Sequence, residues 1–214
     1  MSQRRLPVYL LLDTSGSMRG EPIHSVNVGL QAMLSALRQD PYALDTVHLA
    51  LITFDITARV EMPLTPLTDV NLSQIETPGP GATFLGAALE LLIKSVDRDL
   101  RHSSANVKGD WRPLLFVMTD GSPSDVQTYR RMVPAVKQRN FARIIACAAG
   151  PKARRESLLE LTDQVVMLET MDSAAFSSFF KWVSASVSIG SSSAGVGSER
   201  VNLPPPPPEI QLVL

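Results

Sequence analysis

The chain is poor in several features that would assign it to a class of protein at once. It has a single cysteine, Cys147, so an internal disulfide is excluded and a reducing compartment is favoured. Its 20 basic and 21 acidic side chains give a formal net charge of -1, which provides no general attraction to nucleic acid or anionic lipid. No apolar run approaches the about 20 residues that a membrane-spanning helix needs. We therefore expect a cytoplasmic protein with no nucleic-acid partner and no membrane span.

The first residues imitate a secretory leader, because Arg4 and Arg5 precede an apolar run at 6–12. The run stops at Asp13, and no small-residue cleavage site follows it. We therefore expect no signal peptide. Hydrophobic residues make up 44% of the chain, which is enough for one domain with a buried core.

Short apolar runs alternate with segments of helical character. The runs predict buried strands at 6–12, 47–54, 114–119, 144–149 and, more weakly, 165–168. Helices are predicted between them and after them, at 23–37, 85–96, 125–139, 154–161 and 176–187. Because fully apolar strands suit a sheet that is covered on both faces, we expect a three-layer, doubly wound α/β fold with a mostly parallel sheet. The first strand should be central in this sheet.

One short predicted strand, at 59–64, breaks the alternation. The connection from Phe54 is too short for a crossover helix but sufficient for a hairpin. Pro63 and Pro66 also favour an edge position, because proline donates no hydrogen bond to a neighbouring strand. We expect this strand to be antiparallel at one edge of the sheet.

The composition changes near the C-terminus. Serine and glycine are frequent at 184–198, and 204–208 is a run of prolines that favours a polyproline II helix. We therefore expect one domain at 1–188 and a tail at 189–214 outside it. The apolar end of the tail, 210–214, is a candidate for adding a strand to the exposed sheet edge of a partner or of a neighbouring copy, and a solvated linker without a role is the alternative.

Oxygen-bearing side chains gather where the first apolar run ends. Asp13, Ser15 and Ser17 alternate there, and open α/β sheets bind ligands beyond the carboxyl ends of their strands. Oxygen ligands suit a hard cation, magnesium above all, rather than zinc or copper. The alternative is that these residues form a turn and cap the next helix, which their types also favour.

Two further segments favour a metal site. Asp120 directly follows the predicted strand at 114–119, and Thr83 stands at a loop-to-helix junction. Each has an ordinary explanation, because Asp-Gly is a common turn and threonine caps helices well. Three oxygen-rich loops on one side of a single sheet are harder to explain in that way.

These residues resemble the metal-ion-dependent adhesion site (MIDAS) of the von Willebrand factor A (vWA) domains. Asp13, Ser15 and Ser17 match its Asp-x-Ser-x-Ser motif, and Thr83 and Asp120 match its distant threonine and aspartate in the same order. The resemblance implies that Ser15 and Ser17 bind the ion directly. It implies that Thr83, Asp13 and Asp120 bind it directly or through water. It also implies Mg²⁺, with Mn²⁺ or Ca²⁺ as alternatives, and a partner protein that offers an acidic side chain.

The resemblance to vWA domains covers about 6–188, and a narrower one lies within it. The segments VYLLLDTSGSM at 8–18, GPGATFLGAAL at 79–89 and FVMTDGSPSD at 116–125 look like the TerY-type proteins of bacterial tellurium-resistance clusters. This narrower resemblance implies a cytoplasmic scaffold in a stress response, with protein kinase and phosphatase partners.

Two functional hypotheses follow, and the first is a binding module without enzymatic activity or catalytic residues. The second is a magnesium-dependent phosphoryl-transfer or hydrolytic enzyme, for which the sequence offers no nucleophile or general base beside the motif. His24, His48 and His102 show no metal-ligand spacing. Cys147 lies in a predicted buried strand, and a single thiol is no site for tellurium, so any protection is expected to be indirect. Asp55 follows a strand, and we expect it to form a turn.

Overall fold

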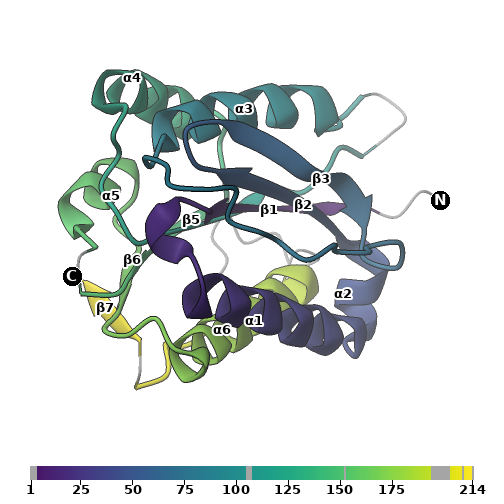
Figure 1. Ribbon diagram of the computed structural model, residues 1–214. Helices are drawn as coiled ribbons and strands as arrows, with labels where there is room; N and C mark the ends of the chain where they lie inside the picture. The colour runs from purple at the N-terminus through teal and green to yellow at the C-terminus, as the bar shows by residue number, and fades with distance from the viewer. Residues whose placement is uncertain (1–3, 105–107, 152, 194–202, 209, 214) are drawn as a thin grey trace.

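The computed structural model of the chain describes residues 4–104, 108–151, 153–193, 203–208 and 210–213. Its strands are β1 (Leu6–Asp13), β2 (Val47–Phe54), β3 (Ala58–Pro66), β4 (Leu114–Thr119), β5 (Arg143–Ala149), β6 (Val165–Leu168) and β7 (Gln211–Val213). Its helices are η1 (Gly16–Met18), α1 (Glu21–Arg38), α2 (Pro41–Thr46), α3 (Leu85–Asp99), α4 (Val126–Lys137), α5 (Arg155–Leu161) and α6 (Ser173–Ser193). Helices α1, α2 and α6 cover one face of the sheet, and α3, α4 and α5 cover the other (Figure 1). The fold is therefore the expected three-layer α/β arrangement.

The sheet is mostly parallel, in the strand order β3-β2-β1-β4-β5-β6-β7. β1 pairs in parallel with both β2 and β4, and β5 and β6 continue the parallel order. β3 pairs antiparallel with β2, which confirms the predicted antiparallel edge strand and extends it at both ends. Every residue of β1 is buried, because helices cover both faces of the sheet.

The order of the strands reverses beside β1. The chain adds β2 and β3 on one side of β1 and then crosses to β4 on the other. Such a switch point leaves a crevice beyond the carboxyl ends of the strands. The register shows that these strands end at the same level. Asp13 of β1 stands opposite Phe54 of β2, and Leu12 stands opposite Met118 of β4. Thr119 of β4 in turn stands opposite Ala148 of β5. The loops that follow these four strands therefore start at the same edge of the sheet.

Two hydrophobic cores separate the three layers. Alternate residues of β1 point to opposite faces, so Leu10 belongs to the core under α1 and α6, and Leu11 to the core under α3 and α4. In the first core the ring of Phe180 lies against Gly29 of α1, where a Cβ would be 2.3 Å from the ring. Glycine at this position thus allows α1 and α6 to approach closely. Complete burial of a side chain such as Phe180 contributes about 1.5–3 kcal/mol to stability.

The serine-rich segment that begins at Ser184 and runs into the expected tail is helical up to Ser193. Serine competes with the helical backbone for hydrogen bonds, which is why this composition suggests a linker. Here the hydroxyls bond back to the helix itself. The Oγ of Ser186 donates to the carbonyl of Trp182 at 2.8 Å, and the Oγ of Ser191 donates to the carbonyl of Ser188 at 2.8 Å.

The described end of the chain, 203–208 and 210–213, also packs on the domain, which corrects the expectation of a separate tail for these residues; 194–202, 209 and 214 lie outside the described residues. The indole N–H of Trp182 donates a hydrogen bond of 2.9 Å to the carbonyl of Pro204, and Ile210 is 3% exposed. β7 then pairs antiparallel with β6 and forms the second edge of the sheet. The apolar C-terminal segment thus completes the sheet of its own chain, because β6 would otherwise carry unpaired backbone groups at an open edge.

One short helix, α2, escapes prediction from hydrophobic periodicity. Asp40 caps it by accepting a hydrogen bond of 2.9 Å from the backbone N–H of Tyr42, and Pro41 occupies its first position. Over the ranges that the structure describes, no helix combines the length and apolar character needed to cross a membrane.

Candidate metal centre

The first loop of the candidate site starts at Asp13, the last residue of β1. The Oδ1 of Asp13 accepts a hydrogen bond of 2.8 Å from the backbone N–H of Ser15, and both residues are 1% exposed. The backbone N–H of Thr14 donates to the carbonyl of Phe54 at 2.8 Å, which fixes the loop to the end of β2. Ser17 is exposed, and its Oγ lies 3.3 Å from the Oγ of Ser15. Two of the predicted ligand hydroxyls are therefore neighbours.

The loop after β4 supplies the second carboxylate. Asp120 is the first residue beyond β4 and is 6% exposed. The Oγ1 of Thr119 donates to the Oδ2 of Asp13 at 2.5 Å and accepts a hydrogen bond of 3.2 Å from the backbone N–H of Gly121. Thr119 thus joins the ends of β1 and β4. Sequence reasoning missed it, although a hydroxyl residue directly before Asp120 was a usable signal.

The third loop, which precedes α3, brings Thr83 to the other two. The backbone N–H of Gly16 donates to the carbonyl of Gly81 at 3.3 Å, so this loop contacts the one that follows β1. A Cβ on Gly121 would lie 3.1 Å from the Oγ1 of Thr83, which places that hydroxyl beside the loop of Asp120. Thr83 is 7% exposed. The three loops that carry the five predicted residues are therefore in mutual contact.

The beginning of α4 holds the loop of Thr83 in place. The backbone N–H of Ser124 donates to the carbonyl of Thr83 at 2.8 Å. The carboxylate of Asp125 accepts hydrogen bonds from two backbone N–H groups at the N-terminus of α3, those of Gly86 at 3.0 Å and Ala87 at 2.8 Å. A Cβ on Gly86 would lie 2.4 Å from the backbone nitrogen of Tyr129. Glycine is therefore needed where α3 and α4 meet.

Asp55, which follows β2, forms the turn that we expected. Its Oδ1 accepts a hydrogen bond of 2.7 Å from the backbone N–H of Thr57, and its Oδ2 pairs with the guanidinium of Arg59 at 3.3 Å. Burial acts to raise the pKa of Asp55, but these bonds outweigh it and hold the pKa below its ordinary value. Its carbonyl accepts a hydrogen bond of 2.8 Å from Phe84, so this turn also anchors the loop of Thr83.

The Asp13 carboxylate is in an unfavourable electrostatic environment without a cation. Burial raises the pKa of the Asp13 carboxyl to about 6, although hydrogen bonds from Thr119 and Ser15 act to lower it. The neighbouring charge of Asp120 raises it further. A divalent cation placed near both carboxylates would relieve this repulsion.

The ligand set fits a hard divalent cation. In octahedral coordination at about 2.1 Å, neighbouring ligand oxygens lie about 3 Å apart, which the hydroxyls of Ser15 and Ser17 approach at 3.3 Å. Within the described part of the chain, no cluster of three or more histidine, cysteine, aspartate or glutamate side chains could hold a metal. The candidate centre therefore depends on hydroxyl oxygens together with two carboxylates.

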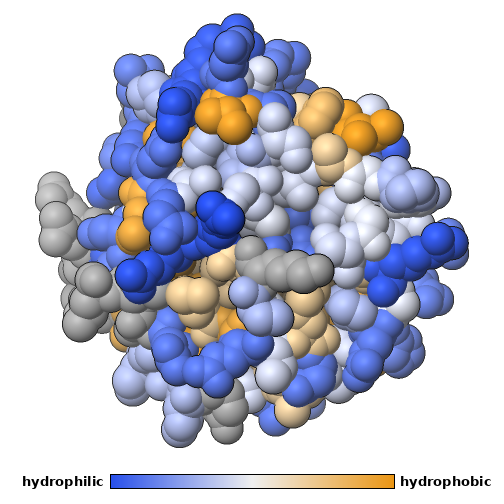
Figure 2. Space-filling view, turned by 60° about the vertical axis from the view of Figure 1, so that its left-hand side comes forward, coloured by the Kyte–Doolittle hydropathy of each residue, from blue (hydrophilic) through white to orange (hydrophobic). Residues whose placement is uncertain are grey.

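The face that carries the site is shown in Figure 2, which is turned toward the carboxyl edge of the sheet. The surface is hollowed near the centre of this view, where pale side chains of intermediate hydropathy gather, and dark blue and orange side chains surround the hollow.

Elsewhere, Cys147 lies within β5 and is completely buried, and burial raises the pKa of its thiol. This burial supports the structural role predicted for that residue.

The sequence model of the von Willebrand factor type A domain matches residues 8–181. Because the match spans most of the chain, this protein belongs to that family. A comparison with curated proteins finds no match.

Several solved structures share the fold at low sequence identity. Proximal thread matrix protein 1 from the mussel byssus, solved with a zinc-occupied MIDAS motif, is 16% identical with a TM-score of 0.63, over 86% of this chain and 48% of that chain. The pilus adhesin SpaC from Lactobacillus rhamnosus GG is 13% identical with a TM-score of 0.68, over 89% of this chain and 31% of SpaC. BatB from Bacteroides thetaiotaomicron is 15% identical with a TM-score of 0.57, over 84% of this chain and 97% of BatB. This chain thus spans about half of the mussel protein and under a third of SpaC.

Proposed function

We propose that the protein is a metal-dependent protein-binding module. Mg²⁺, or Mn²⁺ or Ca²⁺ in its place, is held by Ser15, Ser17 and Thr83 together with Asp13 and Asp120, and an acidic side chain of a partner protein completes its coordination. The observation that carries the proposal is the mutual contact of the three loops, which gathers the five residues at one edge of the sheet. Within the first loop the hydroxyls of Ser15 and Ser17 lie 3.3 Å apart, and both carboxylates are buried.

The five residues have different roles in this proposal. The Oδ1 of Asp13 is engaged by the backbone of Ser15 and its Oδ2 by Thr119, so Asp13 orients the loop and supplies charge. Ser15 and Ser17 are neutral ligands, and Thr83 offers a third hydroxyl. When bound, the ion supplies an electrophilic centre, which neutral ligands preserve and which a partner carboxylate can satisfy.

A magnesium-dependent phosphoryl-transfer or hydrolytic enzyme is the second candidate function. The raised pKa of Asp13, about 6, is the observation that favours it, because perturbed carboxyls are common in active sites. The composition of the loops supports the binding module instead. The segments 13–20, 78–84 and 120–125 contain no histidine, lysine or cysteine, so a base or nucleophile would have to come from the aspartates and hydroxyl residues of the site itself. Magnesium-dependent turnover of a generic phosphate ester, abolished by Asp120→Ala, would decide for the enzyme.

The biological setting that we propose is a bacterial tellurite-resistance or stress-response system. The support is the resemblance of the segments at 8–18, 79–89 and 116–125 to TerY-type proteins. In this setting the protein is a cytoplasmic scaffold that brings kinase and phosphatase partners together. It protects against tellurite indirectly, because a single buried thiol offers no site for the element.

A pull-down experiment tests the proposed function. The full chain and its Ser15→Ala/Ser17→Ala variant are immobilised and exposed to native bacterial lysate, once with magnesium and once with a chelator. We expect the unmodified chain to capture a specific protein in magnesium only, and the variant to capture none. Capture that is equal with chelator, or equal in the variant, overturns the proposal.

A further inference from the structure

The rim of the candidate metal site differs in chemistry on its two sides. β2 is the neighbour of β1 on one side, whereas β4 and then β5 follow on the other. The turn after β2 carries Ile56, and on the side of β5 Arg154 precedes α5 and Arg155 begins it. Because these strands are parallel and end at the same level as Asp13, both segments rise from the edge that holds the site.

The β2 side of the rim carries one exposed apolar side chain. Ile56 is 54% exposed, although large apolar side chains are usually buried. A Cβ on Gly81 would lie 3.7 Å from the Cγ2 of Ile56, which places this side chain against the loop that leads to Thr83. The ion pair between Asp55 and Arg59 holds the turn on which Ile56 stands.

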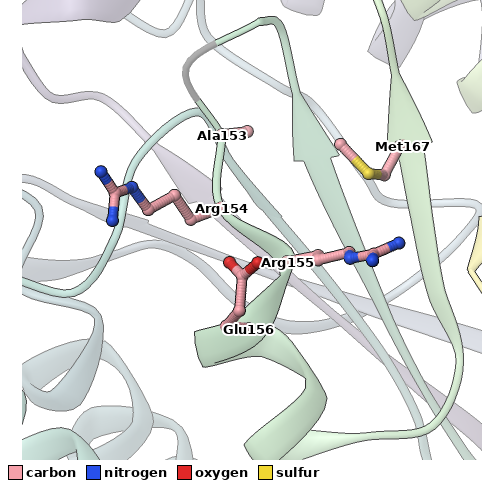
Figure 3. Close-up of a pocket in the computed structure, with 5 residues that line it drawn as sticks. All are labelled: Ala153, Arg154, Arg155, Glu156 and Met167. Atoms are coloured by element: carbon pink, nitrogen blue, oxygen red, sulfur yellow. The ribbon is translucent and has the colours of Figure 1, made fainter.

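The β5 side of the rim is cationic. Arg154 and Arg155 are exposed, and neither forms an ion pair with another described residue. They line a shallow pocket with Glu156 and Met167. In Figure 3 the side chain of Arg155 extends toward Met167 of β6, and that of Arg154 extends in the opposite direction. Since β4 and β6 flank β5 on opposite sides, Arg154 is the arginine on the side of the metal site.

We propose that the partner presents an extended acidic segment, with an apolar residue over Ile56 and a second acidic residue at Arg154. This inference rests on the proposed function, in which the first acidic residue binds the ion. A guanidinium forms paired, charge-assisted hydrogen bonds with a carboxylate, which an exposed lysine matches less well. The asymmetry of the rim thus selects among the acidic segments that could all reach the ion.

The spacing of the strands predicts the spacing of the residues in that segment. β5 lies two strand spacings from β1, about 10 Å, and β2 lies one, about 5 Å. An extended chain advances about 3.3 Å per residue. The second acidic residue therefore lies about three positions from the one that binds the ion, and the apolar residue about one or two positions on the other side.

Synthetic peptides test this inference. Each is a labelled glycine–serine peptide with a central aspartate, and binding to the full chain in magnesium is measured by fluorescence anisotropy. The complete peptide adds a leucine on one side and a second aspartate on the other, and two control peptides replace the second aspartate with lysine or the leucine with serine. We expect the complete peptide to bind roughly tenfold more tightly than the lysine peptide, with a difference that shrinks at high salt.

Two variants with the same change of charge locate the effect. Arg154→Glu should abolish the preference for the second aspartate, whereas Arg155→Glu should retain most of it. Magnesium-dependent binding that is indifferent to the second aspartate, or equal loss in both variants, overturns the inference and leaves the proposed function standing. If none of the peptides binds in a magnesium-dependent way, the proposed function fails, and this inference fails with it.

Discussion

The hydroxyl of Thr119 donates a hydrogen bond of 2.5 Å to the Oδ2 of Asp13. Both residues are 1% exposed, so water does not compete for this bond. It joins the last residue of β4 to the last residue of β1 across the switch point of the sheet. The candidate metal centre is therefore built into the junction of two strands rather than into a single loop.

This bond predicts the effect of changing Thr119. Thr119→Val keeps the shape of the side chain but leaves a buried carboxylate oxygen of Asp13 without its donor, which should lower the free energy of unfolding by about 1–3 kcal/mol. Magnesium affinity should fall as well, because Asp13 is no longer oriented. Urea unfolding in chelator and calorimetric titration measure the two effects. Thr119→Ser is the control and should retain both properties, and an equal loss in both variants would contradict the stated role of the hydroxyl.

The raised pKa of Asp13 predicts a pH dependence of stability in the absence of metal. The carboxyl binds a proton more readily in the folded state, with a pKa of about 6, than at its ordinary value of 3.8. Its contribution to stability is thus fully present below about 3.8 and is lost as the pH rises through about 6. In chelator, the unmodified protein should lose on the order of 2–3 kcal/mol relative to Asp13→Asn over this range. The free energy of unfolding in urea is measured against pH for both proteins. If the two profiles run parallel, Asp13 is not the group responsible for the loss of stability.

The contact between α3 and α4 predicts a contrast between two glycines. A Cβ on Gly86 would lie 2.4 Å from the backbone nitrogen of Tyr129, whereas a Cβ on Gly79 would meet nothing within 4 Å. Gly86→Ala should destabilise the protein by about 1–3 kcal/mol and weaken metal binding through the loop of Thr83. Gly79→Ala should leave stability nearly unchanged, and thermal unfolding of the two variants compares them. Equal melting temperatures of the two variants would mean that α3 and α4 can move apart without a loss of stability, which would contradict the stated role of Gly86.

The packing of the C-terminal strand predicts a second contrast. Ile210 is buried, and its neighbour Gln211 is exposed. Ile210→Asp should destabilise the domain by about 2–5 kcal/mol, and release of β7 from β6 should promote self-association through the open edge. Gln211→Lys, which keeps a donor for the carboxylate of Glu169, should have little effect on either property. Thermal unfolding and size-exclusion chromatography are the measurements, and a harmless Ile210→Asp would restore the prediction of 189–214 as a tail outside the domain.

Strands that are buried on both faces were predictable from the sequence almost residue by residue. β2, β4 and β6 coincide with the apolar runs at 47–54, 114–119 and 165–168, because a strand that touches no water contains few polar residues. The C-terminal segment was not predictable in this way. Its serines and prolines are typical of a linker, and only the pairing of β7 with β6, distant in sequence, places it in the sheet.

In the candidate site, too, local patterns were predictable from the sequence, whereas contacts between distant segments were not. Asp13, Ser15 and Ser17 could be proposed from the sequence because they alternate within one short motif. Thr119 and Asp125 were missed, because their roles depend on hydrogen bonds between loops that are far apart in the chain. A pattern read along the sequence indicates candidate ligands, whereas the residues that orient those candidates become visible only when the loops are brought together.

The central claim is that the hydroxyls of Ser15 and Ser17 hold a divalent cation, and magnesium-dependent thermal unfolding tests it most directly. A ligand that binds only the folded state at 100 times its dissociation constant stabilises a protein by about 2.7 kcal/mol. We expect the melting temperature of the unmodified protein to rise with magnesium. The Ser15→Ala/Ser17→Ala variant should melt close to the unmodified protein in chelator and show no rise with magnesium. An equal rise in both proteins would contradict the account.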